Sequence, residues 1–176
     1  MIKLIAAALA VGLATTAVAA ADDGVTPEEV IAKVREAAAY LAKEGAAGLP
    51  AFEAEGSPFV WKDTYVFVYD CARDVIVAHP VPASRGLSVT GLEGADGKPY
   101  GAALCAAAEK PGGSWGEYVW PKPVVGADGT LSYTDDAFRK VAYMLAVEGQ
   151  PYEVGAGIYN DPMTLGELDA LVPEGD

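Results

Sequence analysis

The sequence predicts an α+β fold in which a long N-terminal helix packs on a mainly antiparallel five-stranded sheet. Apolar residues recur at helical spacing in residues 27–44, whereas residues 64–69 alternate as a strand requires. The remaining expected strands are joined by short hairpin connections, which favour antiparallel pairing. No internal repeat or linker divides the chain, so a single domain is expected.

The first 20 residues precede this fold and are expected to be a cleaved export signal. Lys3 supplies a positive charge, residues 4–18 are apolar, and small residues occupy positions 17–21, which is the order typical of a signal peptide. A retained membrane anchor is the alternative, although a span takes roughly 20 apolar residues. We expect residues 21–176 to form one domain, periplasmic or secreted, with no segment inserted in the membrane.

The chain is strongly acidic, and this limits its partners. It has 12 Lys and Arg against 25 Asp and Glu, and loss of Lys3 leaves 11 basic residues. A surface of that sign repels nucleic acid and anionic lipid head groups. Neither is expected as a partner, and an anionic ligand would need a locally positive pocket.

The first helix carries clear start and stop signals. Thr26 and Glu29 have the spacing of a capping box, and Pro27 suits the first turn. Gly45 ends the periodic run. At 1.5 Å per residue, residues 27–44 would span roughly 27 Å, enough to cross a small sheet. A second, short helix is expected at residues 50–55.

The first full strand, residues 64–69, places three aromatic side chains on one face and two valines on the other. Apolar bulk on both faces indicates a central strand, covered by a helix on one side and by a cavity or loops on the other. The later elements are expected in this order: a strand at 74–79, a loop at 81–98, a helix at 100–109, strands at 115–120, 138–147 and 152–158, and a short helix at 165–171 capped by Thr164. Residues 126–136 are expected to form a polar connection.

Cys71 and Cys105 are the two cysteines of the chain. Thiols in an oxidising compartment tend to pair, so a disulfide is predicted. It would stabilise the fold by roughly 3 to 4 kcal/mol on the chain-entropy account. The alternative is a pair of buried thiols.

Five phrases in one order carry a family resemblance. They are DTYVFVYDC (63–71), AHP (78–80), ADGKPYGAALCAAAEKPGG (95–113), WGEYVWPKP (115–123) and VGAGIYND (154–161). Together they resemble a single Cache domain of the second type, the PAS-like extracellular sensor module of bacterial chemoreceptors and histidine kinases. The resemblance implies a PAS-like fold and a role in chemotaxis or other signal transduction. It also implies a pocket for a small metabolite, often a short carboxylate or amino acid, and a possible membrane receptor as partner.

Aromatic walls with a few fixed polar groups can build such a pocket. The basic candidates are His79, Lys122 and Lys140, each able to hold a carboxylate by a charge-assisted hydrogen bond. The aromatic candidates on the strands are Tyr65, Tyr69, Tyr118, Trp120 and Tyr143. The alternatives are a packed core for the aromatic residues, a structural role for His79 and a solvent-facing position for Lys122.

The sequence argues against catalysis. No serine lies in a Gly-x-Ser-x-Gly motif, and no phosphate-binding loop or dinucleotide fingerprint is present. One histidine and two cysteines cannot form a transition-metal site without several carboxylates. We therefore expect no enzyme activity, no metal and no cofactor. The alternative to a sensor is a secreted structural or interaction module whose pocket is filled by side chains.

Overall fold

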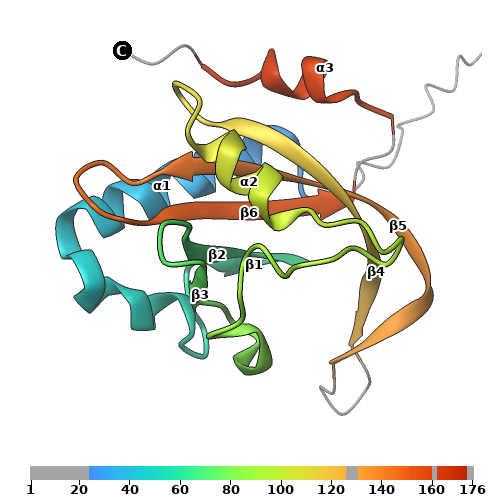
Figure 1. Cartoon of the computed structure of the whole chain (residues 1–176), viewed down its shortest axis with the longest axis horizontal. Coiled ribbons are helices and arrows are strands. Elements are labelled where there is room, and N and C mark those ends of the chain that lie inside the picture. Colours follow the sequence, from blue (N-terminus) through green and yellow to red (C-terminus); the bar gives the residue numbers. More distant parts are fainter. Residues whose placement is uncertain (1–23, 126–130, 160–161, 174–176) are drawn as a thin grey trace, which may run out of the picture.

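The computed structural model describes residues 24–125, 131–159 and 162–173. The expected export signal lies outside these residues, as do residues 126–130, the first part of the connection expected at 126–136. Figure 1 shows the fold with its α-helices and β-strands labelled. The elements, in chain order, are α1 (Pro27–Glu44), η1 (Gly45–Phe52), β1 (Val60–Trp61), β2 (Thr64–Asp70), β3 (Val75–Ala78), η2 (Pro82–Ser84), α2 (Gly101–Ala108), β4 (Ser114–Val125), β5 (Leu131–Ala146), β6 (Glu153–Tyr159) and α3 (Leu165–Asp169).

The sheet has six strands rather than the five predicted. The strand order is β1-β2-β6-β5-β4. Strand β3 pairs with the C-terminal part of β2, which does not pair with β1. Every pairing between the described strands is antiparallel, which confirms the predicted sheet type. The additional strand is β1, whose two residues are too few to show a period of two. A tight turn with Lys62 at φ 47° joins it to β2.

Strands β4 and β5 extend well beyond the predicted ends. The predicted strand ended at Trp120, and it is followed by Pro121 and Pro123, which cannot donate a ladder hydrogen bond. The structure continues the β4–β5 pairing through both prolines, with a register shift between them. Since β4 is the last strand in the sheet order, prolines are tolerated there. Residues 131–136, predicted as connection, belong to β5 instead.

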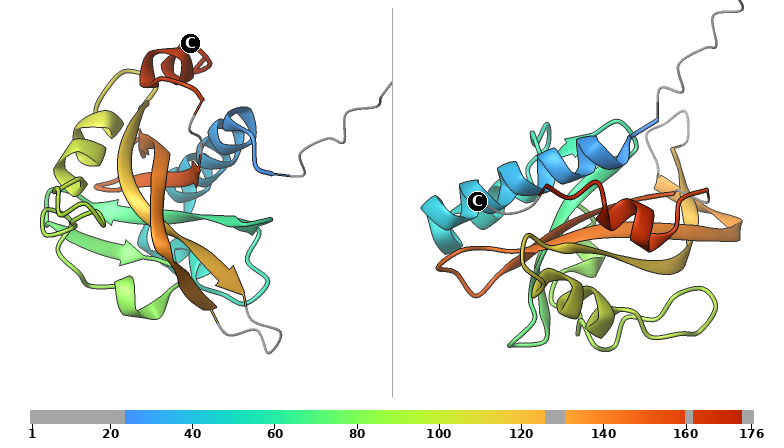
Figure 2. Two further views of the ribbon diagram at one scale, coloured as in Figure 1. Left: turned by 90° about the vertical axis from the view of Figure 1, so that its right-hand side faces the viewer. Right: turned by 90° about the horizontal axis from the view of Figure 1, so that it is seen from above.

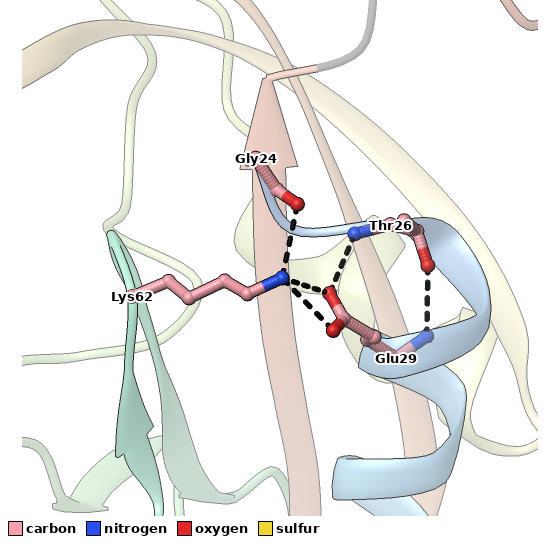
Figure 3. A network of polar contacts seen from close by, with 4 residues as sticks. All are labelled: Gly24, Thr26, Glu29 and Lys62. Carbon is pink, nitrogen blue, oxygen red and sulfur yellow. Dashed lines mark hydrogen bonds and ion pairs between the residues drawn. The ribbon is translucent and has the colours of Figure 1, made fainter. Parts of the chain in front are cut away.

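The predicted capping box of α1 is confirmed and is tied to the sheet (Figure 3). The Thr26 hydroxyl accepts the Glu29 N–H at 3.2 Å, and the Glu29 carboxylate accepts the Thr26 N–H at 3.0 Å. Lys62, in the β1–β2 turn, donates to the same carboxylate at 2.9 Å and to the Gly24 carbonyl at 3.2 Å. The first turn of α1 is therefore anchored to the edge of the sheet.

The second helix differs from its prediction in position. It is a 3-10 helix, η1, that follows α1 directly, whereas a short helix was expected at 50–55. Gly45 adopts a positive φ of 57° and ends α1 without an intervening loop. Phe52, at the end of η1, is fully buried and stacks on Phe59 at 4.3 Å between ring centroids. Packing of this ring therefore places the segment against the sheet.

Helices cover the two faces of the sheet unequally. Seen from above in Figure 2, α1 lies along one face, and α2 lies on the other together with the loop that precedes it. We call the buried cluster on the α1 face the helix-side core; it includes Val34, Leu41, Val66 and Val68. The cluster on the α2 face, which includes Phe67, Tyr69, Leu104 and Met144, is the pocket-side core. Successive residues of β2 therefore alternate between the helix-side core and the pocket-side core, as the sequence predicted.

The predicted disulfide is present. Cys71 and Cys105 are bonded, with their Cα atoms 6.0 Å apart. The bond joins the β2–β3 turn to α2, so it fastens the short helix to the pocket side of the sheet.

Among the described residues, none of the helices is long and apolar enough to cross a membrane. Thr164, the predicted cap, opens α3 and forms a capping box with Glu167.

Candidate ligand-binding site

The candidate site is a cavity on the pocket side of the sheet, with a volume of about 100 Å³. Strand residues form its floor, and the chain between β3 and α2 forms its rim. The side chains that line it are Tyr65, Phe67, Tyr69, Ile76, His79, Ser84, Leu87, Leu92, Tyr100, Tyr118, Trp120 and Lys140. Drug-sized ligands occupy roughly 300–1,000 Å³, and a water molecule about 30 Å³. The cavity therefore suits a molecule of a few non-hydrogen atoms.

Strand geometry explains how distant residues meet here. Tyr65, Phe67 and Tyr69 alternate along β2 and so share its pocket face. On β4 and β5, Tyr118 is the antiparallel partner of Lys140, which places their side chains on one face of the sheet. Tyr118 and Lys140 are therefore neighbours in the sheet although they are far apart in the sequence, and β6 separates them from the β2 residues.

Lys140 is the buried cation of the cavity, with 7% of its surface exposed. Its Nζ lies 5.5 Å from the ring centroid of Tyr65, 5.9 Å from that of Tyr118 and 5.4 Å from that of Tyr159. Burial lowers the pKa of Lys140 to about 8, against a smaller opposing effect of Asp63. Within the described residues, no carboxylate forms an ion pair with it. At pH 7 the ammonium is therefore mostly charged and surrounded by aromatic faces.

His79 is a neutral group at the same cavity. Burial, and secondarily the charge of Lys140, lower the pKa of His79 to about 4. Its Nδ1 accepts the Val81 N–H at 2.9 Å, so the proton of the neutral ring is on Nε2. Arg85 donates to the His79 carbonyl at 2.8 Å and pairs with Glu53 at 2.9 Å. The imidazole is thus held in one tautomer and offers a single N–H.

Three tyrosines supply neutral walls and hydroxyl groups. Desolvation raises the pKa of Tyr69 and of Tyr118 well above the ordinary value, and raises the pKa of Tyr100 to about 12. The ring of Tyr100 stacks on that of Tyr118 at 4.2 Å, and both meet Trp120 edge-on. These hydroxyls remain protonated at neutral pH, so Lys140 supplies the positive charge among the lining residues.

Six of the eight residues predicted as ligand contacts line this one cavity. They are Tyr65, Tyr69, His79, Tyr118, Trp120 and Lys140. The structure brings them together from β2, β4, β5 and the end of β3, and their contact with a ligand stays a prediction.

The other two predicted residues lie elsewhere. Tyr143 is three positions from Lys140 on β5, so it faces the helix side, where its hydroxyl donates to the Gly112 carbonyl. Lys122 is exposed, with its Nζ 4.4 Å from the ring centroid of Phe138. Strand parity separates Tyr143 from the pocket, and sequence reasoning had not applied it across β5.

Sequence reasoning also missed part of the lining. Phe67 shares the face of Tyr65 and Tyr69, so alternation alone could have identified it. Leu87 and Leu92 come from an irregular segment in which no periodicity marks the inward side. Tyr100 precedes α2, and its position depends on how that helix docks. In the described parts of the chain, no group of three or more His, Cys, Asp or Glu side chains could hold a metal ion.

Comparison with known proteins gives a family and a fold. The family described as Single Cache domain 2 matches residues 7–161. None of the curated proteins is significantly similar to this chain. A solved methyl-accepting chemotaxis protein from Vibrio parahaemolyticus RIMD 2210633 superposes with a TM-score of 0.51 at 20% identity, covering 74% of this chain and 81% of that one.

Two further solved structures are similar. One, described as a periplasmic sensor domain of a chemotaxis protein, has a TM-score of 0.50 at 23% identity and covers 74% of this chain and 94% of that one. The other, described as the structural basis for carboxylic acid recognition by a Cache chemosensory domain, has a TM-score of 0.49 at 17% identity, with 74% and 86% covered. The two structures with TM-scores of 0.50 and 0.51 show the fold alone, because their identity to this chain is below 25%.

Proposed function

Because the chain belongs to the Single Cache domain 2 family, we propose that it is an exported sensor domain that binds a short monocarboxylate in the cavity beside Lys140. The ligand carboxylate pairs with the Lys140 ammonium, and its short apolar part lies among the aromatic walls. The domain acts in the periplasm or outside the cell and passes its signal to a membrane receptor.

The ammonium of Lys140, buried and without an ion-pair partner among the described residues, is the observation that carries this proposal. Buried charges are ordinarily paired, because leaving water is costly. A pKa lowered from 10.5 to about 8 corresponds to roughly 3 kcal/mol at 1.36 kcal/mol per unit. A carboxylate that binds there recovers this free energy by forming a charge-assisted hydrogen bond.

The rest of the lining narrows the class of carboxylate. None of the lining side chains in the described parts of the chain is a carboxylate, so the ammonium of an amino acid would lie near Lys140 without an acceptor of opposite charge among them. The second charge of a dicarboxylate would face aromatic rings. The His79 Nε2–H and the tyrosine hydroxyls are neutral donors that suit the second carboxylate oxygen. A cavity of about 100 Å³ favours two to four carbon atoms.

The proposal is binding without turnover. His79 Nδ1, which a catalytic base would use, already accepts the Val81 N–H. Cys71 and Cys105 are bonded to each other, so neither offers a thiolate nucleophile. Both observations favour a sensor over an enzyme.

The experiment is a thermal unfolding and calorimetry series on the purified protein with acetate, propionate and pyruvate. The corresponding amides, glycine and succinate serve as comparison ligands. A ligand at 100 times its dissociation constant stabilises by about 2.7 kcal/mol, which raises Tm by about 5–10 °C for a domain of this size. Lys140→Met should abolish the shift, and Lys122→Met, a lysine outside the cavity, should retain it.

Two results would overturn the proposal. One is the absence of any shift with every carboxylate, which would favour a structural module with a filled pocket. The other is an equal shift with acetate and acetamide, since a neutral isostere cannot pair with an ammonium.

A further inference from the structure

Strand β6 presents two glycines, Gly155 and Gly157, on the pocket side of the sheet. They pair with Met144 and Ala142 of β5, which belong to the pocket-side core. Neither glycine has a positive φ, so neither is needed for backbone conformation. These two positions matter because they carry no side chain and so leave space above the strand.

The two glycines make room for different neighbours. A Cβ at Gly155 would lie 2.9 Å from the Phe67 ring and would overlap the Met144 sulfur, so this glycine admits packed core. A Cβ at Gly157 would lie 2.9 Å from Cε of Lys140. The aliphatic stem of Lys140 therefore crosses the bare backbone at Gly157 on its way to the cavity.

The backbone at Gly157 is fixed, so a new side chain would move the lysine rather than the strand. The buried Thr64 hydroxyl donates to the Gly157 carbonyl at 2.7 Å and holds β6 against β2. The remaining neighbours of an added Cβ are the Val141 carbonyl oxygen at 3.2 Å, a tight contact, and the Ala142 Cβ at 3.4 Å, an ordinary one. The Lys140 stem is the close contact able to give way.

We propose that Gly157 is a positioning residue for the ligand, because its missing side chain lets Lys140 lie flat on β6 and fixes where the ammonium meets the bound charge. This inference rests on the proposed function. The rings of Tyr65, Tyr118 and Tyr159 surround the ammonium at 5.4–5.9 Å, so a displaced stem cannot restore the same position. Gly157 thereby acts on ligand affinity through Lys140 and without touching the ligand.

The test compares Gly157→Ala with Gly166→Ala, a control on α3 where an added Cβ meets nothing within 4 Å. Affinity for acetate is measured by calorimetry, and the titration of the Lys140 ammonium is followed by NMR. Gly157→Ala should weaken acetate binding about tenfold or more, equal to about 1.4 kcal/mol, and should move the Lys140 pKa from about 8 toward its ordinary value. Gly166→Ala should change neither.

A second arm needs no ligand. Lys140→Ala removes the atom that the new Cβ would meet most closely, so Gly157→Ala should lower Tm more in the native sequence than in the Lys140→Ala background. If Gly157→Ala unfolds the protein in both backgrounds, or if it keeps wild-type acetate affinity and an unchanged Lys140 titration, the inference is wrong. If the unsubstituted protein binds no carboxylate but the stability coupling holds, the proposed function fails while the Gly157–Lys140 contact stands.

Discussion

The two faces of the sheet differ in how they are packed and in which side chains they bury. On the helix side, Val30, Val34 and Leu41 of α1 are fully buried against β2, β5 and β6, and the cluster is dominated by apolar side chains. On the pocket side a cavity remains, and the largely buried side chains of His79 and Lys140 line it. Stability therefore comes mainly from one face, while the other keeps groups that are costly to bury.

The difference follows from the two covering helices. The 18 residues of α1 are amphipathic and span the sheet, whereas α2 has eight residues and is rich in alanine. Such a short helix with small side chains cannot fill the space above the sheet. Irregular segments of the chain cover the remaining part of this face. The disulfide supplies the attachment that α2 cannot obtain from apolar area alone.

The largest expected effect tests the helix side. Leu41→Ala removes a fully buried side chain from the helix-side core, so it should lower the free energy of unfolding by about 3–5 kcal/mol in a denaturant titration. Leu92→Ala, at the half-buried rim of the cavity, should cost about 1 kcal/mol, because it enlarges a space that already exists. Equal losses would mean that the two faces do not differ in packing.

The disulfide is expected to have the next largest effect, on the pocket side. Replacing Cys71 and Cys105 by alanine reopens a loop with a sequence separation of 34, which should cost about 3–4 kcal/mol. Amide hydrogen exchange should rise first in α2, since β4 and β5 remain paired without the bond. Uniform loss of protection across both faces would show that α2 does not depend on this attachment.

These two regions also differ in how well the sequence predicts them. The capping box at Thr26 and the alternation of residues 64–69 are local patterns, and both are confirmed. The disulfide was predicted from cellular compartment and is likewise confirmed. The parts of the helix side that α1 and β2 contribute were therefore predictable, because their buried positions repeat at the spacing of a helix or a strand, whereas Phe52 and Tyr143 were not placed there.

The pocket side was predictable only in part. Lys140 and Tyr118 were named as candidates, but their pairing across β4 and β5 depends on register, which no local pattern fixes. Tyr143 was assigned to the same site although strand parity turns it to the other face. Leu87 and Leu92 lie in irregular chain, whose inward positions depend on tertiary packing rather than period.

The third effect concerns the charge that the pocket side buries. Lys140→Met should stabilise the unliganded protein by about 3 kcal/mol at pH 7, because the folded state then no longer desolvates an ammonium. The folded pKa is about 8 and the unfolded value 10.5, so the unfolded state binds more protons between them. The native protein should therefore gain stability as pH rises from 8 to 10.5, and the advantage of the variant should disappear.

Unfolding titrations of both proteins at pH 7, 8, 9 and 10 provide the measurement. The other charged or titratable groups near Lys140 include His79, which is already neutral above pH 6, Tyr118, whose pKa is raised well above its ordinary value, and the Asp63 carboxylate. Their contribution cancels in the difference between the two proteins. A difference independent of pH, or a destabilised variant at pH 7, would show that Lys140 is not the desolvated charge inferred from its burial.

The smallest effect tests the polar edge of the helix side (Figure 3). Thr26→Ala removes the cap of α1 and should cost about 1 kcal/mol, well below the loss expected from Leu41→Ala. Lys62→Met should cost less than Thr26→Ala, because the ion pair with Glu29 is two-fifths exposed on both sides. Its effect should shrink as salt is raised from 0.05 to 1 M, whereas that of Thr26→Ala should not. If Lys62→Met lowered the free energy of unfolding as much as Leu41→Ala, the polar contacts at the end of α1, and not its buried face, would hold the helix on the sheet.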